Sequence, residues 1–125
     1  MASAVLPDKL PGVLRDAILG MVRREGPDLS ARQLVVFLIC YLEDGPHTVR
    51  GLAARLDVSK PAITRSLDRL TDLGFAKRAA DPADRRSVLV TRTRKGEALL
   101  AELKRLLTAA VAASNKPAKK PARGK

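Results

Sequence analysis

The segment from Thr48 to Gly96 limits the fold of this chain more than any other, because two short helical patterns and a basic hairpin follow one another in it. Thr48 can cap the first helix, whose apolar residues share one face. These residues are Val49, Leu52, Ala53 and Leu56. A turn at Asp57-Val58 follows, and a helix, a turn and a second helix present the second helix to a DNA groove. The segment therefore predicts a helix-turn-helix fold that binds duplex DNA.

The second helix of this segment is expected to begin after Ser59, which can cap it, and to run to about residue 73. Its buried face is predicted to hold Ile63, Leu67 and Leu70, since these recur at helical spacing. The opposite face carries polar and small residues: Lys60, Pro61, Thr64, Arg65, Asp68 and Arg69. Gly74 is placed to end the helix in a left-handed cap.

A two-stranded β wing is predicted after that helix. Phe75 to Ala79 suits a short strand, and Ser87 to Arg92 alternates so that Val88 and Val90 face inward. The loop between them contains Asp84, Arg85 and Arg86. The fold class is therefore mainly α with a small two-stranded wing.

Helices are also predicted on both sides of the helix-turn-helix segment. From Pro11, the apolar residues Leu14, Ile18, Met21 and Val22 recur at helical spacing until Gly26-Pro27. Ser30 and Gln33 form a capping-box pattern for a helix to Leu42, and Thr93 can cap a last helix to about Ala113. The domain expectation is a flexible start over 1–10, a winged helix-turn-helix domain with flanking helices over 11–114, and a disordered basic tail over 115–125.

The positive charge of the chain is concentrated in two places. The formal net charge is +11, yet residues 1–58 hold seven basic and seven acidic side chains. Residues 59–95 hold ten basic against four acidic side chains, and residues 116–125 hold five basic and none acidic. An excess placed on the second helix, the hairpin and the tail indicates binding to phosphate.

The exposed face of the second helix supplies the candidate base contacts. Arg65 can pair with both acceptors of a guanine, and Thr64 can meet a thymine methyl group. The small residues Pro61 and Ala62 allow close approach, while Lys60 and Arg69 suit phosphate contacts. Thr48 and Ser59, at the starts of the two helices, complete the predicted DNA-binding set on these helices. The alternative is that this face is only solvated.

The wing supplies the candidate minor-groove contacts. Arg85 and Arg86 sit at the far end of the hairpin, where a guanidinium can enter a narrow minor groove. Asp84 can orient one of them through a bidentate pair, or it can supply turn chemistry alone.

These residues and their spacing resemble those of a known protein family. The run VRGLAARLDVSKPAITRSLDRLTDLGF, followed by DPADRRSVLV and TRKG, closely resembles the winged-helix core of MarR-type transcription factors. The resemblance implies a cytoplasmic, usually dimeric regulator that binds near-palindromic operators, often as a repressor released by a small molecule. It also implies that the helix from Ser59 to Arg69 is the recognition helix, with Asp84 and Arg86 as the wing pair.

The chain departs from the family pattern at three points. Asp57 stands at a turn position often held by glycine, and aspartate tolerates left-handed backbone. Arg92 stands where an apolar strand residue is usual, so either the base of the wing frays or the arginine reaches outward to phosphate. The family dimerises through long terminal helices, and this chain offers a modest first helix and one after the wing.

The remaining candidate groups indicate no catalysis, metal or cofactor. Cys40 lies in the most apolar helix and is interpreted as a buried inert thiol rather than a redox switch. His47 is interpreted as a solvent-facing loop residue without companion ligands. The single cysteine favours a reducing cytoplasmic interior, and we expect neither a signal peptide nor a membrane span.

The leading hypothesis is a sequence-specific regulator that reads the major groove with helix 59–73 and the minor groove with wing 80–86. The alternative is a nucleoid-associated, architectural DNA-binding protein, which the tail composition favours. A third class is a winged-helix module for protein interactions. A small-molecule effector is neither required nor excluded by the residues.

Overall fold

The computed structural model describes residues 5–116 of the chain. The chain forms two compact units, one of Pro27–Ala101 and one that combines Met1–Gly26 with Glu102–Lys125. The larger unit holds α2 (Ala31–Leu42), α3 (Val49–Leu56), α4 (Lys60–Asp72) and a small sheet. The last helix, α5 (Arg94–Ser114), contributes residues to both units.

Three of the helices in the larger unit begin at the caps that the sequence predicts. At α2, the Gln33 backbone N–H donates to Ser30 Oγ at 3.0 Å, and the Ser30 N–H donates to Gln33 Oε1 at 2.9 Å. At α3, Thr48 Oγ1 accepts from Gly51 N at 2.9 Å. Each cap gives a partner to a backbone N–H that the first helical turn leaves unpaired.

The two turns of the helix-turn-helix segment use left-handed residues. Asp57 ends α3 with φ of 56°, and Gly74 follows α4 with φ of +81°. After each turn the chain bonds back to the helix, through Val58 N to Ala53 O at 3.0 Å and Phe75 N to Leu70 O at 2.8 Å. Aspartate at the first turn is therefore compatible with the geometry, as predicted.

The core of the larger unit lies where α2 contacts α4. The largest fully buried side chains are Phe37, Ile63, Leu67, Leu70 and Val36. The Phe37 ring stacks on Tyr41, with ring centroids 4.4 Å apart. The predicted inward face of α4 is confirmed, and the remaining face of the helix is left for other contacts.

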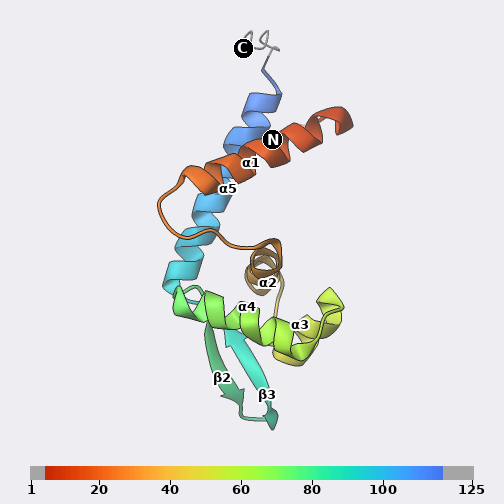
Figure 1. Ribbon diagram of the computed structural model, residues 1–125, viewed down its shortest axis with the longest axis vertical. Helices are drawn as coiled ribbons and strands as arrows, with labels where there is room; N and C mark the ends of the chain where they lie inside the picture. The colour runs from red at the N-terminus through yellow and green to blue at the C-terminus, as the bar shows by residue number, and fades with distance from the viewer. Residues whose placement is uncertain (1–4, 117–125) are drawn as a thin grey trace. The chain divides into compact units, whose positions relative to one another are not determined.

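The sheet has one strand more than predicted. Its order is β1-β3-β2, with β1 at His47–Thr48, β2 at Lys77–Asp81 and β3 at Asp84–Thr91, all antiparallel neighbours. The β2–β3 hairpin extends away from α3 and α4 (Figure 1). The predicted long loop is a two-residue turn at Pro82 and Ala83, since β3 begins at Asp84.

Val88 and Val90 were both predicted to face inward from the wing, and the structure buries only one of them. Val90, near the base of the hairpin, is buried, but Val88 is 37% exposed. Val88 pairs with Ala80, and most of β2 and the first part of β3 are exposed. The prediction for Val88 was wrong because alternation places a residue on a face without ensuring that another element covers that face.

Arg92 neither frays the wing nor reaches outward to phosphate. Its Nε donates to the Cys40 carbonyl at 2.8 Å, and its Nη2 donates to the Glu43 carbonyl at 3.1 Å. These carbonyls lie at the end of α2, where the last turn leaves acceptors without helical partners. His47 also differs from prediction: it is half-buried in β1, with Nε2 2.8 Å from the Glu43 carbonyl oxygen.

A buried hydroxyl joins three segments of the larger unit. Tyr41 Oη donates to the Phe75 carbonyl at 2.7 Å and accepts from the Thr93 backbone N–H at 2.9 Å. Thr93 Oγ1 donates to the Gly74 carbonyl at 2.6 Å and accepts from Gly96 N at 3.0 Å, which confirms Thr93 as a cap for α5. The end of α2, the start of the wing and the start of α5 are thereby linked.

The smaller unit contains η1 (Pro7–Lys9), α1 (Leu10–Arg23) and the later part of α5. A 3-10 turn and a helix from Leu10 therefore occupy part of the segment expected to be loose over 1–10. The small core of this unit contains Val13, Ala17 and Ala110. Residues 1–4 and the tail beyond Lys116 lie outside the described residues.

Most of the apolar residues that predict α1 face solvent. Leu14, Ile18 and Val22 are 60%, 46% and 57% exposed, and Leu10 is 51% exposed. The neighbouring small residues Val13 and Ala17 make the packing contacts. Among residues 5–116, no helix combines the length and apolar character that crossing a bilayer requires.

Candidate nucleic-acid interface

Helix α4 has one buried and one exposed face, which fits a helix that enters a groove. Ile63 and Leu67 have no exposed surface and anchor the helix to the core. The predicted outward residues are exposed: Lys60, Pro61, Thr64, Arg65 and Arg69. Two arginines and a lysine therefore face solvent along a helix that the core holds in place.

Ala62 does not belong to this exposed face. It is 6% exposed and lies on the buried side with Ser66, one turn further along α4. Its backbone N–H is taken up by Ser59 Oγ at 3.2 Å. Ala62 was predicted to allow close approach of DNA, and its place around the helix turns its side chain toward the core.

The hydroxyls of Ser59 and Thr48 act first as helix caps. Each accepts a hydrogen bond from the N–H three residues ahead, at 3.2 Å and 2.9 Å respectively. Since the first turn of a helix leaves several N–H groups unpaired, these starts remain suited to an anion such as a phosphate.

The wing places Arg85 and Arg86 together at the start of β3, both exposed. Asp84 does not pair with either guanidinium in the described structure; its Oδ1 accepts from the Arg86 backbone N–H at 3.0 Å. The carboxylate thus shapes the turn, which is the alternative that the sequence left open. The expected bidentate pair was therefore wrong.

An ion pair between α4 and the wing was not predicted. Arg78 Nη1, on β2, lies 2.7 Å from Asp68 Oδ1, on α4. Asp68 lies on the exposed face of α4, and a free carboxylate there would repel phosphate. Pairing offsets that charge, and it joins the two elements that carry the candidate DNA contacts.

Spacing in the sequence could not predict this pair, because Asp68 and Arg78 lie on different elements. The helical spacing rule applies only to residues three or four apart on one helix. Two further exposed basic side chains border the same elements: Arg50 in the first turn of α3 and Lys77 at the start of β2. The net charge of residues 59–95 signalled Lys77 but not Arg50. Both suit phosphate contacts rather than base reading.

Cys40 is 4% exposed, and burial raises the pKa of its thiol to about 11. A thiol with a raised pKa is a weak nucleophile at neutral pH because little of it is ionised. The buried, inert thiol expected from sequence is consistent with this environment. Within the described part of the chain, no group of three His, Cys, Asp or Glu side chains could hold a metal ion.

Comparison with known proteins places this geometry in context. A model of the MarR family matches residues 28–87. Two curated HTH-type transcriptional regulators, from Mycobacterium bovis and Mycobacterium tuberculosis, are 39% identical over 83 residues, which is 66% of this chain. The match spans 57% of the length of those relatives.

Solved structures resemble the chain over a larger share. The crystal structure of MarR is 30% identical, with a TM-score of 0.63, and the match covers 84% of this chain and 78% of that one. The structure of CouR from Rhodococcus jostii RHA1, bound to p-coumaroyl-CoA, is 26% identical with a TM-score of 0.63. That match covers 88% of this chain and 77% of CouR.

Proposed function

The chain belongs to the MarR family, and from that premise we propose that it is a sequence-specific regulator of transcription that binds double-stranded DNA, acting as a repressor. The observation that carries the proposal is the two-faced helix α4, which is anchored by buried Ile63 and Leu67 and exposes Arg65 and Arg69. The names of the curated relatives support a role in transcription rather than catalysis.

In this proposal α4 enters the major groove. Arg65 reads a guanine through its two acceptors, and Thr64 contacts a neighbouring base edge. Lys60 and Arg69 contact phosphate and fix the register of the helix. The exposure of all four side chains supports these roles, as does the start of the helix at Ser59.

The wing is proposed to reach the adjacent minor groove with Arg85 and Arg86. A narrow minor groove has a strong negative potential, which favours a guanidinium over a more hydrated ammonium. The Asp68–Arg78 pair supports this arrangement, because it ties the strand that precedes the wing turn to the helix in the major groove.

We further propose that the protein is a homodimer, so that two copies of α4 meet two operator half-sites about one helical turn apart. The exposed stripe of Leu10, Leu14, Ile18 and Val22 supports this step. Contiguous apolar surface on a monomer often marks an association site. Because the proposed ligand is genomic DNA, we place the protein in the cytoplasm, at the nucleoid.

A small-molecule effector is also part of the proposal. CouR was solved with p-coumaroyl-CoA bound, and it shares 26% identity with this chain. No cofactor is needed for the DNA-binding step itself, which depends on side-chain and backbone contacts.

The proposal is tested by mapping binding sites across the genome and then comparing variants on one mapped site and on random DNA. We expect Arg65→Ala to weaken the specific site by about 1–3 kcal/mol, with a smaller loss on random DNA. Arg105→Ala, which removes an equally charged exposed side chain from α5, is the matched control. Equal losses on both DNAs for Arg65→Ala would exclude base reading by that residue.

The same maps distinguish the second candidate, an architectural protein that coats DNA. The five basic residues of 116–125 favour it, since each neutralised phosphate contributes about 0.9 to the salt slope of binding whatever the sequence. Removing 116–125 should lower specific and random binding together. Broad occupancy without a shared sequence would support coating over regulation at operators.

A further inference from the structure

The wing is attached to the rest of the larger unit at its base. Residues 77–80 of β2 and residues 84–86 of β3 are exposed. Burial begins near the far end of β3, where Val90 is 6% exposed. The direction in which the tip of the wing points therefore depends on the contacts at the base of the hairpin.

Arg92 directly follows β3 and contacts the terminal turn of α2, residues 40–43. Its Nε donates to the Cys40 carbonyl at 2.8 Å, and its Nη2 donates to the Glu43 carbonyl at 3.1 Å. The guanidinium carbon lies 5.7 Å from the centre of the Tyr41 ring, in a cation–π contact. A helix end attracts a cation because its last carbonyls lack helical partners and carry the negative end of the dipole. One side chain thus holds the end of β3 on the terminal turn of α2.

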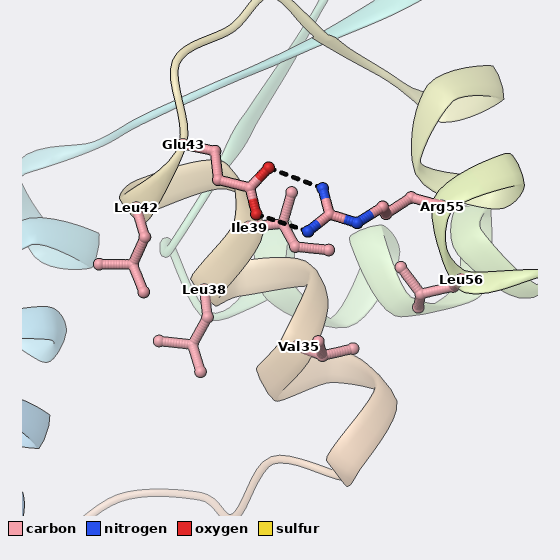
Figure 2. A pocket seen from close by; sticks show the side chains of 7 residues that line it. All are labelled: Val35, Leu38, Ile39, Leu42, Glu43, Arg55 and Leu56. Carbon is pink, nitrogen blue, oxygen red and sulfur yellow. Dashed lines mark hydrogen bonds and ion pairs between the residues drawn. The ribbon is translucent and has the colours of Figure 1, made fainter.

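The same terminal turn is joined to the other strand of the wing and to α3. Tyr41 Oη donates to the carbonyl of Phe75, two residues before β2, at 2.7 Å. The Glu43 carboxylate accepts from Arg55 Nη1 and Nη2, near the end of α3, at 2.6 and 2.7 Å (Figure 2). Since α3 leads directly through its turn to α4, the terminal turn of α2 connects the base of the wing with the helix-turn-helix segment.

We propose that Arg92 is a positioning residue for DNA binding, an inference that rests on the proposed function of the wing. Arg92 fixes the direction of the wing and so places Arg85 and Arg86 against DNA without contacting DNA itself. The six residues from Arg86 to Arg92 span about 20 Å of strand. A rotation of about 10° at the base would move the tip by about 3 Å, whereas hydrogen-bond distances vary over only about 0.5 Å.

Other attachments keep the hairpin folded when Arg92 is replaced. Strand β1 pairs with β3 at Leu89 and Val90, and Arg78 on β2 pairs with Asp68 on α4 at 2.7 Å. The ion pair is partly exposed and contributes little by itself to a fixed direction. Methionine at position 92 keeps a long apolar stem but cannot donate to the two carbonyls. We therefore expect Arg92→Met to redirect or loosen the wing without unfolding the sheet.

The first test measures the direction of the wing in the full chain without DNA, by residual dipolar couplings of backbone N–H groups. In Arg92→Met, the couplings of β2 and β3 should no longer fit the alignment that describes α2, α3 and α4. Arg94→Met is the matched control, because Arg94 is an exposed basic residue in the first turn of α5, and its wing couplings should still fit. Thermal unfolding followed by circular dichroism checks that both variants are folded. Unchanged wing couplings in Arg92→Met would overturn the proposal.

The second test is a double-mutant cycle on one mapped DNA site at fixed salt. Arg92→Met should weaken binding about fivefold when the wing is natural, since the misplaced wing loses its contacts. The loss should be less than about twofold in the Arg85→Ala/Arg86→Ala background, where those contacts are already absent. Arg94→Met should have the same effect in both backgrounds.

The cycle separates positioning from direct contact and from failure of the wing itself. A phosphate contact made by Arg92 would weaken both backgrounds equally and lower the salt slope by about 0.9 in each, which would overturn the role of Arg92 alone. Unchanged affinity of Arg85→Ala/Arg86→Ala would instead overturn the proposed contact between the wing and DNA, and with it the role of Arg92 in binding.

Discussion

Removing the hydroxyl of Tyr41 should lower the free energy of unfolding substantially, because two backbone groups bond to that one oxygen. In Tyr41→Phe the ring keeps its stacking on Phe37 at 4.4 Å, so the change is confined to the oxygen. That oxygen accepts from the Thr93 N–H and donates to the Phe75 carbonyl, at 2.9 and 2.7 Å. Both backbone groups would lose this partner in an environment where water has little access.

The magnitude follows from those two groups. Leaving a buried donor or acceptor unpaired costs about 1–3 kcal/mol, and Thr93 lies toward the low end because it is only partly buried. We therefore expect Tyr41→Phe to lower the free energy of unfolding by about 2–4 kcal/mol. The melting temperature should fall by on the order of 10 °C.

The assay is urea unfolding followed by circular dichroism at a fixed protein concentration, which holds any contribution from association constant. Thr108→Val is the control, because its hydroxyl donates to the Lys104 carbonyl at 2.8 Å on an exposed part of α5. That variant should change the stability by less than about 0.5 kcal/mol. A loss for Tyr41→Phe no greater than the loss for Thr108→Val would refute the reasoning.

Two further outcomes are expected. Ile18→Lys should reduce the mass measured by light scattering from dimer to monomer, because it places a charge in the exposed stripe of α1; Ala54→Lys, on the exposed side of α3, should leave the mass unchanged. Since folding raises the pKa of Cys40 from 9.0 to about 11, the stability that its neutral thiol contributes is fully present below about pH 9 and is lost as pH rises toward about pH 11. The urea midpoint should therefore fall more between about pH 8 and pH 10.5 for the natural chain than for Cys40→Ala. An equal fall for the two proteins would contradict the effect assigned to burial of the thiol.

The boundaries of the helix-turn-helix segment could be predicted because their causes are local. The caps at Ser30, Thr48 and Ser59 each bond to an N–H three residues ahead, and Gly74 supplies its own positive φ. Such interactions involve residues that are neighbours in sequence, so they can be recognised without a fold. The exposed face of α4 was predicted for the same reason.

The errors occurred where a side chain's surroundings come from another element. Alternation placed Val88 correctly on a face of β3, but no sequence pattern states which part of that face is covered. The apolar stripe of α1 was recognised, yet the small residues Val13 and Ala17 form the contact within the unit. Burial is a property of two packed surfaces, and the sequence describes one of them at a time.

By itself, the sequence determined the order and type of the helices, the turns between them and the concentration of charge on α4, the wing and the tail. Only the tertiary structure decided that Arg92 bonds to the Cys40 carbonyl and that Tyr41 holds Thr93, because each pair is separated by 52 residues. It also decided that Asp68 pairs with Arg78 across two elements. Local hydrogen bonds and periodicity are encoded within a few residues, whereas these contacts exist only after packing has brought distant backbone together.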